Sequence, residues 1–267
     1  MSGFRCARAT IALAAHTSEV CARRVQGRPM FSLRPPSTVA IWPRMKPEPG
    51  ETKMAPLILD VSLWSADLVN LATEIQRICG YADCFHIDVA DGHFAPNLLF
   101  FPDLVSAIRR STPKPLHVHL MVSDPASMVG RFVDAGADLI SVHVESGGVA
   151  EALREISSAG RRSGLAIRLD TPVEALRKYV GKVDHVISMG THLGVKGADL
   201  APEACDRIRA IRRLFDGKSE MKIYADGGIR RHSVPRLREA GADAIVPGSL
   251  IFQAEDKEAT QRWLKSL

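Results

Sequence analysis

The chain has 267 residues, of which 46% are hydrophobic and 24% are charged. This length and composition fit one globular domain of roughly 200 to 250 residues, or two small ones. A net charge of +5 would suit a nucleic-acid or membrane-surface binder, but residues 1–50 alone carry eight Lys or Arg against two Glu. The other residues sum to −1, so we expect no nucleic-acid and no membrane partner for the folded part.

The N-terminal segment, residues 1–53, is rich in Arg, Gly, Pro and Ser and has no sustained helical or strand periodicity. Its composition predicts a disordered extension, which is either an organellar transit peptide or an upstream extension before Met54. Its apolar run, residues 9–15, is shorter than the roughly 20 residues that span a bilayer. The five cysteines lack paired metal-ligand spacing, which predicts reduced thiols and a cytoplasmic location, or an organelle if the segment is a transit peptide.

Short β-rich runs alternate with amphipathic stretches from residue 57 onward. The predicted strands are residues 57–65, 84–90, 116–122, 139–145, 164–170, 185–190, 222–226 and 244–251. Helical stretches lie between them, as in residues 201–215, where apolar side chains recur at helical spacing. Eight alternations predict a single (β/α)8 TIM barrel over residues 54–267. A doubly wound open sheet is the alternative, but it usually has a Gly-rich fingerprint after its first strand, and none is present.

Active sites of such barrels lie at the C-terminal ends of the strands. The polar or sulfur-bearing residues predicted there are Ser62, His86, Asp88, His117, His119, Met121, His143, Glu145 and Asp226. Taken singly, a barrel His is more often a core residue than a ligand. Taken together, His86, Asp88, His119 and Asp226 offer two nitrogens and two oxygens, which suits one divalent ion such as Zn, Mn, Fe or Co. Such an ion would also compensate two carboxylates that are costly to bury unpaired.

Two glycine-containing loops follow the last two predicted strands, at residues 226–229 (DGGI) and 247–249 (PGS). Barrels often bind phosphate with the loops after strands seven and eight, where glycines let backbone N–H groups approach the anion closely. As turns alone, Gly-Gly and Gly-Ser are weak signals. Their position after these two strands predicts a phosphate site made by Gly227, Gly228, Gly248 and Ser249, together with Gly197 from the preceding loop.

Six segments resemble the ribulose-phosphate 3-epimerase family, in matching order across residues 57 to about 255. They are residues 62–67 (SLWSAD), 86–97 (HIDVADGHFAPN), 119–122 (HLMV), 143–145 (HVE), 226–229 (DGGI) and 248–249 (GS). The resemblance implies His86, Asp88, His119 and Asp226 as metal ligands, with Asp88 and Asp226 as the acid-base pair. Such a pair suits this reaction, because inverting a carbon next to a ketone requires proton removal on one face and proton return on the other.

The sequence departs from the family in the loop after the sixth strand, residues 189–198 (MGTHLGVKGA). Gly194 and Gly197 are kept, whereas the family's Asn-Pro becomes His192-Leu193 and a central Gly becomes Lys196. Ala90 also replaces a Met, and Arg168-Leu169 replaces a Lys/Asn-Pro pair. These changes are either drift or adaptations of the substrate pocket, with Lys196 adding a point charge to an anion site and His192 and Arg168 near the reacting end.

The sequence therefore predicts a metal-dependent epimerase of a small ketose phosphate, acting by two-base proton transfer through an enediolate. A lyase or decarboxylase on the same barrel and a non-catalytic paralogue are the alternatives. The expected partner is the phosphorylated sugar, and a homo-oligomer is expected. The candidate substrate-binding residues are Ser62, His119, Met121, Gly194, Lys196, Gly197, Asp226, Gly227, Gly228, Gly248 and Ser249.

Overall fold

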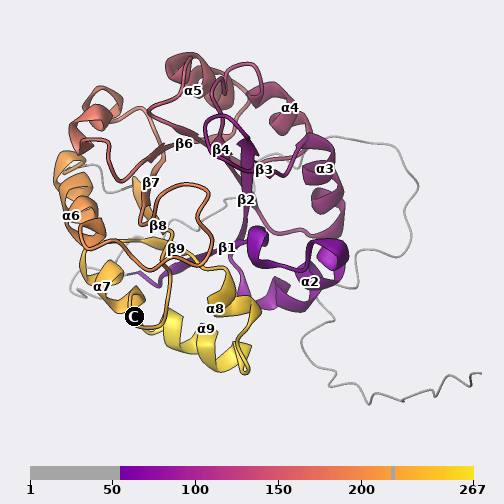
Figure 1. Cartoon of the computed structure of the whole chain (residues 1–267). Helices are drawn as coiled ribbons and strands as arrows, with labels where there is room; N and C mark the ends of the chain where they lie inside the picture. Colours follow the sequence, from indigo (N-terminus) through magenta and orange to yellow (C-terminus); the bar gives the residue numbers. More distant parts are fainter. Residues whose placement is uncertain (1–54, 218–219) are drawn as a thin grey trace, which may run out of the picture.

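A closed ring of parallel strands with helices on its outside forms the architecture of the chain (Figure 1). The computed structural model describes residues 55–217 and 220–267. The prediction of a disordered extension over residues 1–53 lies outside the described residues. Within them, no helix is long and apolar enough to cross a membrane.

Eight parallel strands in the described part form the barrel, and a parallel pairing of the first with the second closes it. A short strand, β3, adds to β2 in antiparallel orientation at the rim. The strands are β1 (Ile58–Ser62), β2 (Cys84–Asp91), β3 (Leu98–Leu99), β4 (Leu116–Met121), β5 (Leu139–His143), β6 (Arg162–Ile167), β7 (His185–Met189), β8 (Lys222–Asp226) and β9 (Ala244–Val246). The predicted TIM barrel is confirmed.

Helices follow the strands around the outside of the barrel (Figure 1). Between β6 and β7 the connection is the 3-10 helix η4 (Val173–Tyr179) instead of an α-helix. Shorter 3-10 helices are η1 (Leu63–Ser65), η2 (Leu68–Asn70) and η3 (Cys79–Tyr81). The α-helices are α2 (Leu71–Ile78), α3 (Pro102–Ser111), α4 (Val129–Asp134), α5 (Val149–Ser158), α6 (Ala204–Leu214), α7 (Val234–Glu239), α8 (Ser249–Phe252) and α9 (Lys257–Lys265).

Side-chain alternation divides each strand between two environments. In β2, Phe85, Ile87 and Val89 belong to the large apolar core between strands and helices. His86 and Asp88 point the other way, into the barrel. The register then aligns Asp88 with His119 of β4, so polar residues from neighbouring strands meet inside the barrel.

The ends of two predicted strands are corrected, and one short strand was not predicted. The strand predicted over residues 244–251 ends at Val246, because residues 249–252 turn into helix α8. The strand predicted over residues 57–65 ends at Ser62, whose side chain caps η1 by accepting a hydrogen bond from the Trp64 backbone N–H at 3.3 Å. The rim strand β3 was not predicted, since two residues carry too little periodicity to indicate a strand.

Candidate active site

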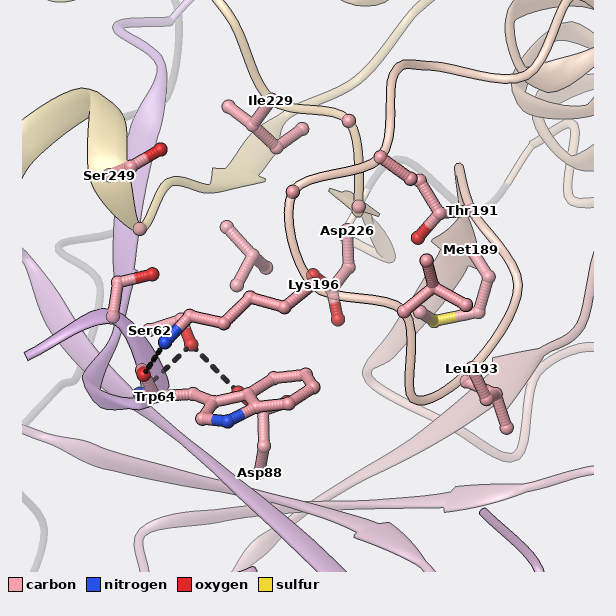
Figure 2. Close-up of a pocket in the computed structure, with 18 of the residues that line it drawn as sticks. Ser62, Trp64, Asp88, Met189, Thr191, Leu193, Lys196, Asp226, Ile229 and Ser249 are labelled. Carbon is pink, nitrogen blue, oxygen red and sulfur yellow. Dashed lines mark hydrogen bonds between the residues drawn. The ribbon is translucent and has the colours of Figure 1, made fainter. Parts of the chain in front are cut away.

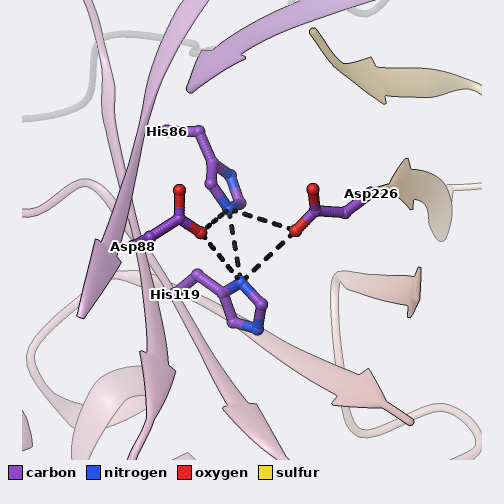
Figure 3. Close-up of side chains that lie close together, drawn as sticks. All are labelled: His86, Asp88, His119 and Asp226. Atoms are coloured by element: carbon purple, nitrogen blue, oxygen red, sulfur yellow. Dashed lines mark hydrogen bonds and ion pairs between the residues drawn. The ribbon is translucent and has the colours of Figure 1, made fainter. Parts of the chain in front are cut away.

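Four side chains from three strands meet at the C-terminal end of the barrel (Figure 3). His86 and Asp88 come from β2, His119 from β4, and Asp226 from the last position of β8. The two imidazoles are fully buried, whereas the Asp88 and Asp226 side chains keep 7% and 14% of their surface exposed. The structure thus brings together all four residues of the predicted metal set.

The spacing of the facing atoms tests whether a metal ion fits this cluster. His86 Nε2 lies 3.3 Å from Asp88 Oδ1 and 3.7 Å from Asp226 Oδ2, and His119 Nδ1 lies 3.5 Å from each of the same oxygens. Metal–ligand bonds of roughly 2.0–2.2 Å place two ligands of a tetrahedral ion about 3.3–3.6 Å apart. The four atoms therefore match the spacing of ligands around one divalent ion.

A cavity of about 600 Å³ opens above the cluster (Figure 2). Asp88 and Asp226 line it, but His86 and His119 do not. The cavity brings together, with the two aspartates, most of the predicted substrate-binding residues: Ser62, Met121, Gly194, Lys196, Gly197, Gly227, Gly228, Gly248 and Ser249. The carboxylates at its floor are thus placed to reach a molecule in the cavity, and the imidazoles lie behind them.

Comparison with known proteins identifies the family of the chain. Residues 58–252 match the Ribulose-phosphate 3 epimerase family. The chain belongs to this family. It is 36% identical over 210 residues to the ribulose-phosphate 3-epimerase of Bacillus subtilis, a match that covers 77% of this chain and 94% of the relative. The Synechocystis ribulose-phosphate 3-epimerase is 37% identical over 203 residues, covering 74% of this chain and 88% of the relative.

A solved structure supports the fold of this family member. The 3-keto-L-gulonate-6-phosphate decarboxylase of Vibrio cholerae superposes with a TM-score of 0.62 at 17% identity, covering 79% of this chain and 98% of that chain. At this identity the likeness shows the barrel alone. The family membership, in contrast, identifies the chain as a carbohydrate epimerase, an isomerase.

Asp88 is held by contacts on both of its oxygens. Ser62 Oγ donates a hydrogen bond to Asp88 Oδ2 at 2.7 Å, while Oδ1 faces the imidazoles of His86 and His119. Burial opposes ionisation, but the attraction of His86 and hydrogen bonds from both imidazoles hold the pKa of Asp88 below its ordinary value. Asp88 is therefore in the carboxylate form, and its Oδ1 faces the centre of the cluster.

Two residues behind His119 support its ring. His119 Nε2 lies 2.9 Å from His143 Nε2, and His143 Nδ1 lies 3.1 Å from Glu145 Oε2. Burial lowers the pKa of His143 to about 4, so this imidazole is neutral near pH 7. Sequence reasoning noted His143 and Glu145 at the end of β5 but gave them no role, because their spacing does not show which ring they contact.

Asp60 is a site-supporting residue that sequence reasoning missed. It lies in β1 two positions before Ser62, and its Oδ2 is 2.8 Å from His86 Nδ1 and 2.6 Å from Nδ1 of His117. The signal was available, because a period of two places Asp60 on the same strand face as Ser62. Its other partner, His117, comes from β4, on the far side of β2, and cannot be found from the sequence of β1 alone.

The loop between β7 and α6 crosses the cavity (Figure 2). Its Lys196 Nζ donates a hydrogen bond to the Trp64 carbonyl oxygen at 2.8 Å and lies 5.7 Å from the centre of the Trp64 ring. This contact ties the loop to η1 on the other side of the opening. Gly227 and Gly228 have φ of 90° and 68°, values that favour glycine, and a Cβ on Gly227 would overlap the Thr191 hydroxyl.

Arg168 lies outside the cavity lining, in contrast to its predicted place near the reacting end. Its guanidinium donates to the Phe94 carbonyl oxygen at 2.7 Å and stacks 3.9 Å from the centre of the Phe94 ring. The Phe94 ring in turn lies 4.9 Å from the ring of His143. Arg168 therefore fixes the loop after β2, whereas His192 does line the cavity as expected.

Proposed function

We propose that the chain epimerises D-ribulose 5-phosphate, or a closely related small ketose phosphate, by two-base proton transfer. The observation that supports this best is the division within the cluster. Of its four side chains, the two carboxylates line the cavity and the two imidazoles do not. This is the arrangement that an acid-base pair acting on a bound sugar requires. The name and substrate come from relatives that cover most of the chain.

Asp88 and Asp226 carry the protons in this mechanism. One carboxylate removes the proton from the carbon beside the carbonyl, which leaves an enediolate, and the other delivers a proton to the opposite face. The contacts that lower the pKa of Asp88 keep it ionised and able to accept a proton, so it is proposed as the base in one direction. In the reverse direction the roles exchange, so Asp226 is then the base. The two residues come from β2 and β8, which are separated in the barrel by β1 and β9.

The residues proposed to hold a divalent ion are His86, Asp88, His119 and Asp226. When bound, the ion would supply Lewis-acid stabilisation of the negative charge that develops on the substrate carbonyl oxygen. Ser62 keeps Asp88 oriented through its 2.7 Å hydrogen bond. Zn, Mn, Fe and Co all remain candidates, because imidazole and carboxylate ligands suit each of them.

The phosphate of the substrate is proposed to bind at Gly227, Gly228, Gly248 and Ser249, on the side of the cavity formed by the ends of β8 and β9. Gly194, Lys196 and Gly197 cover this cavity from the β7–α6 loop, and Met121 lines it from β4. Since Lys196 Nζ bonds to the Trp64 carbonyl oxygen here, it would have to exchange that partner in order to contact a phosphate.

We also propose that residues 54–267 form the catalytic domain and that residues 1–53 are dispensable for activity. A chain starting at Met54 should then keep the melting temperature and turnover of the full chain, and a large loss of either contradicts the division. A cytoplasmic location and the absence of nucleic-acid and membrane partners stay predictions.

The expected homo-oligomer is part of the proposal. Leu68, Leu98 and Phe101 are 51%, 83% and 57% exposed, and they line one apolar groove of about 520 Å³. Exposed apolar clusters mark interaction surfaces, and a surface with both a groove and projecting side chains can pair with a second copy about a twofold axis. Light scattering should show an oligomer for the wild type and a lower mass for Leu98→Asp. A monomeric wild type contradicts this proposal.

Proton exchange tests the proposed reaction directly. The protein is incubated with ribulose 5-phosphate, and separately with shorter ketose phosphates, in D2O, and the products are followed by NMR. We expect deuterium at the carbon beside the carbonyl together with the epimeric product. Carbon–carbon cleavage or release of CO2 indicates the lyase or decarboxylase alternative, and no exchange with any substrate indicates a non-catalytic paralogue.

A further inference from the structure

A second polar layer lies beneath the proposed metal cluster and takes no part in the mechanism above. Its centre is Asp60, a carboxylate with no exposed surface, which does not line the cavity. Within the described residues Asp60 Oδ1 has no hydrogen-bond partner. A buried carboxylate with an unpartnered oxygen costs stability, so packing alone gives no reason for an acid at this position.

The contacts of Asp60 fix the proton positions of two imidazoles. Its Oδ2 lies 2.8 Å from His86 Nδ1 and 2.6 Å from His117 Nδ1. Both separations are those of charge-assisted hydrogen bonds, in which the carboxylate oxygen accepts and each Nδ1–H donates. An imidazole must be neutral to bind a metal ion, so the lone pair of a metal-binding His86 is on Nε2, the atom that faces Asp88 and Asp226.

His117 is held from its other side as well. Its Nε2 lies 2.8 Å from Ser141 Oγ, and that oxygen lies 2.7 Å from His185 Nε2. His185 Nε2 also lies 3.0 Å from His117 Nε2. With Nδ1 of neutral His117 donating to Asp60, its Nε2 accepts a hydrogen bond, and the neighbours that can donate it are Ser141 Oγ and His185 Nε2. The space for the His185 ring comes from Gly164, where a Cβ would overlap His185 Nε2. Asp60 is thus the final acceptor of a chain of hydrogen bonds whose donors all point toward it.

The same distances exclude a second metal ion between Asp60, His86 and His117. Two ligands on one ion are at least about 3 Å apart when metal–ligand bonds are roughly 2.1 Å long. The 2.6 and 2.8 Å separations are shorter and are those of charge-assisted hydrogen bonds. The groups of this layer are therefore spaced for hydrogen bonds, whereas the groups of the layer above are spaced for a metal ion.

We propose that Asp60 is a positioning residue for the metal site, which holds the His86 ring in the orientation and tautomer that present Nε2 to the ion. His117, Ser141 and His185 hold Asp60 in turn. The inference rests on the proposed metal cluster, because it concerns the ligand His86. Carboxylates that accept from a ligand imidazole raise its basicity, and their loss typically weakens metal binding about 10–100-fold.

The test is a Co²⁺ titration of the metal-stripped full-length protein, followed by the visible absorption of the bound ion. Asp60→Asn should bind Co²⁺ about 10–100-fold more weakly than the wild type and give an altered spectrum. Asp138→Asn is the matched control, since the Asp138 carboxylate accepts from the Leu116 backbone N–H and from Arg109, both at 2.9 Å, away from the cluster. It should keep the wild-type affinity and spectrum.

The outcomes separate this inference from the proposed function. A wild type that takes up no Co²⁺ contradicts the metal cluster itself and the inference with it. If the wild type binds Co²⁺ and Asp60→Asn binds it equally well with the same spectrum, the positioning role is wrong and the metal cluster stands. If Asp60→Asn does not fold, His117→Asn decides, because it removes one partner of Asp60 and keeps both Asp60 and His86. It should weaken Co²⁺ binding by a smaller factor, and an unchanged affinity and spectrum overturns the inference.

Discussion

The barrel interior contains two layers built from the same kinds of side chain. In the upper layer, His86 and His119 face Asp88 and Asp226 at 3.3 to 3.7 Å. In the lower layer, Asp60 Oδ2 lies 2.6 Å from His117 Nδ1, and Ser141 Oγ lies 2.7 Å from His185 Nε2. The upper spacing suits an ion between the groups, and the lower spacing suits a proton. Residue type alone therefore does not distinguish a metal site from a hydrogen-bonded core.

Access to the cavity separates the layers further. Asp88 and Asp226 line the cavity, whereas the buried His117 and His185 do not. Burial lowers the pKa of both His117 and His185, and repulsion from His117 adds to the shift at His185. Burial also opposes the charged form of His119, but its hydrogen bonds to the acceptors Asp226 and Asp88 raise its pKa. His117 and His185 are thus neutral supports in the lower layer, whereas the upper layer is a site for charge.

The largest expected effect comes from the carboxylates of the upper layer. Asp226→Asn and Asp88→Asn should each abolish measurable epimerisation, because general acid-base catalysis contributes roughly 10²–10⁴-fold. Steady-state kinetics on ribulose 5-phosphate checks this, and deuterium exchange started from each epimer separates the two roles. Retained epimerisation in either variant would remove the two-base mechanism.

Removing an imidazole from the upper layer should remove the ion. His119→Ala should lose most of the bound metal and the activity, since each ligand contributes to affinity and geometry. Elemental analysis of the purified protein should find about one divalent ion per wild-type chain. A chelator should abolish wild-type activity, and added metal should restore it. Full metal content in His119→Ala contradicts the assignment of this ligand.

A methyl group added next to the His185 ring of the lower layer should destabilise the fold and leave the upper layer intact. In Gly164→Ala, the new Cβ overlaps the His185 ring, and overpacking of this kind costs about 1–3 kcal/mol of unfolding free energy. Gly80→Ala is the control, because a Cβ there meets nothing within 4 Å. Urea unfolding measures both variants. Equal unfolding free energies for the two variants would show that the His185 ring can move aside at no measurable cost in stability.

The pH dependence of stability should carry the signature of His185. Its pKa in the folded protein lies well below 6.5, so below about pH 6.5 the unfolded chain binds more protons than the folded one. This contribution to stability is complete above pH 6.5 and is lost as the pH falls. The wild type should lose up to about 1.4 kcal/mol per pH unit more than His185→Gln. Parallel stability curves for the two proteins would contradict a neutral buried His185.

The smallest effect is expected at the loop over the cavity. Lys196→Gly should raise KM for the phosphorylated substrate by about threefold to tenfold, with kcat little changed, because a charge on the phosphate acts equally in ground and transition states. The exposed ammonium already bonds to the Trp64 carbonyl oxygen, which limits the gain. Efficient turnover of ribulose 5-phosphate by the wild type would show that the loop changes are drift. A lower kcat in Lys196→Gly would indicate that the Trp64 contact acts in loop closure instead.

Much of the fold and the upper layer could be predicted from the sequence. Eight strand-helix alternations predict the barrel, and a period of two places His86 and Asp88 on one face of β2. Because active sites of such barrels lie at the strand ends, residues 33 and 138 positions apart along the chain could be assigned to one cluster. Boundaries were less accurate where a cap, such as Ser62, ends a strand within a continuous apolar run.

The tertiary structure alone decided what each polar group contacts. The strand register and the tilt of the barrel set whether a carboxylate lies 2.6 Å or 3.5 Å from an imidazole, and neither quantity can be read from a single strand. For this reason Asp60 looked like an ordinary strand residue, and Arg168 was placed near a pocket that it does not line. Periodicity fixes the face on which a side chain lies. Its partner is fixed by strands distant in sequence, because the short-range forces of hydrogen bonding and metal ligation depend on separations of a few tenths of an ångström.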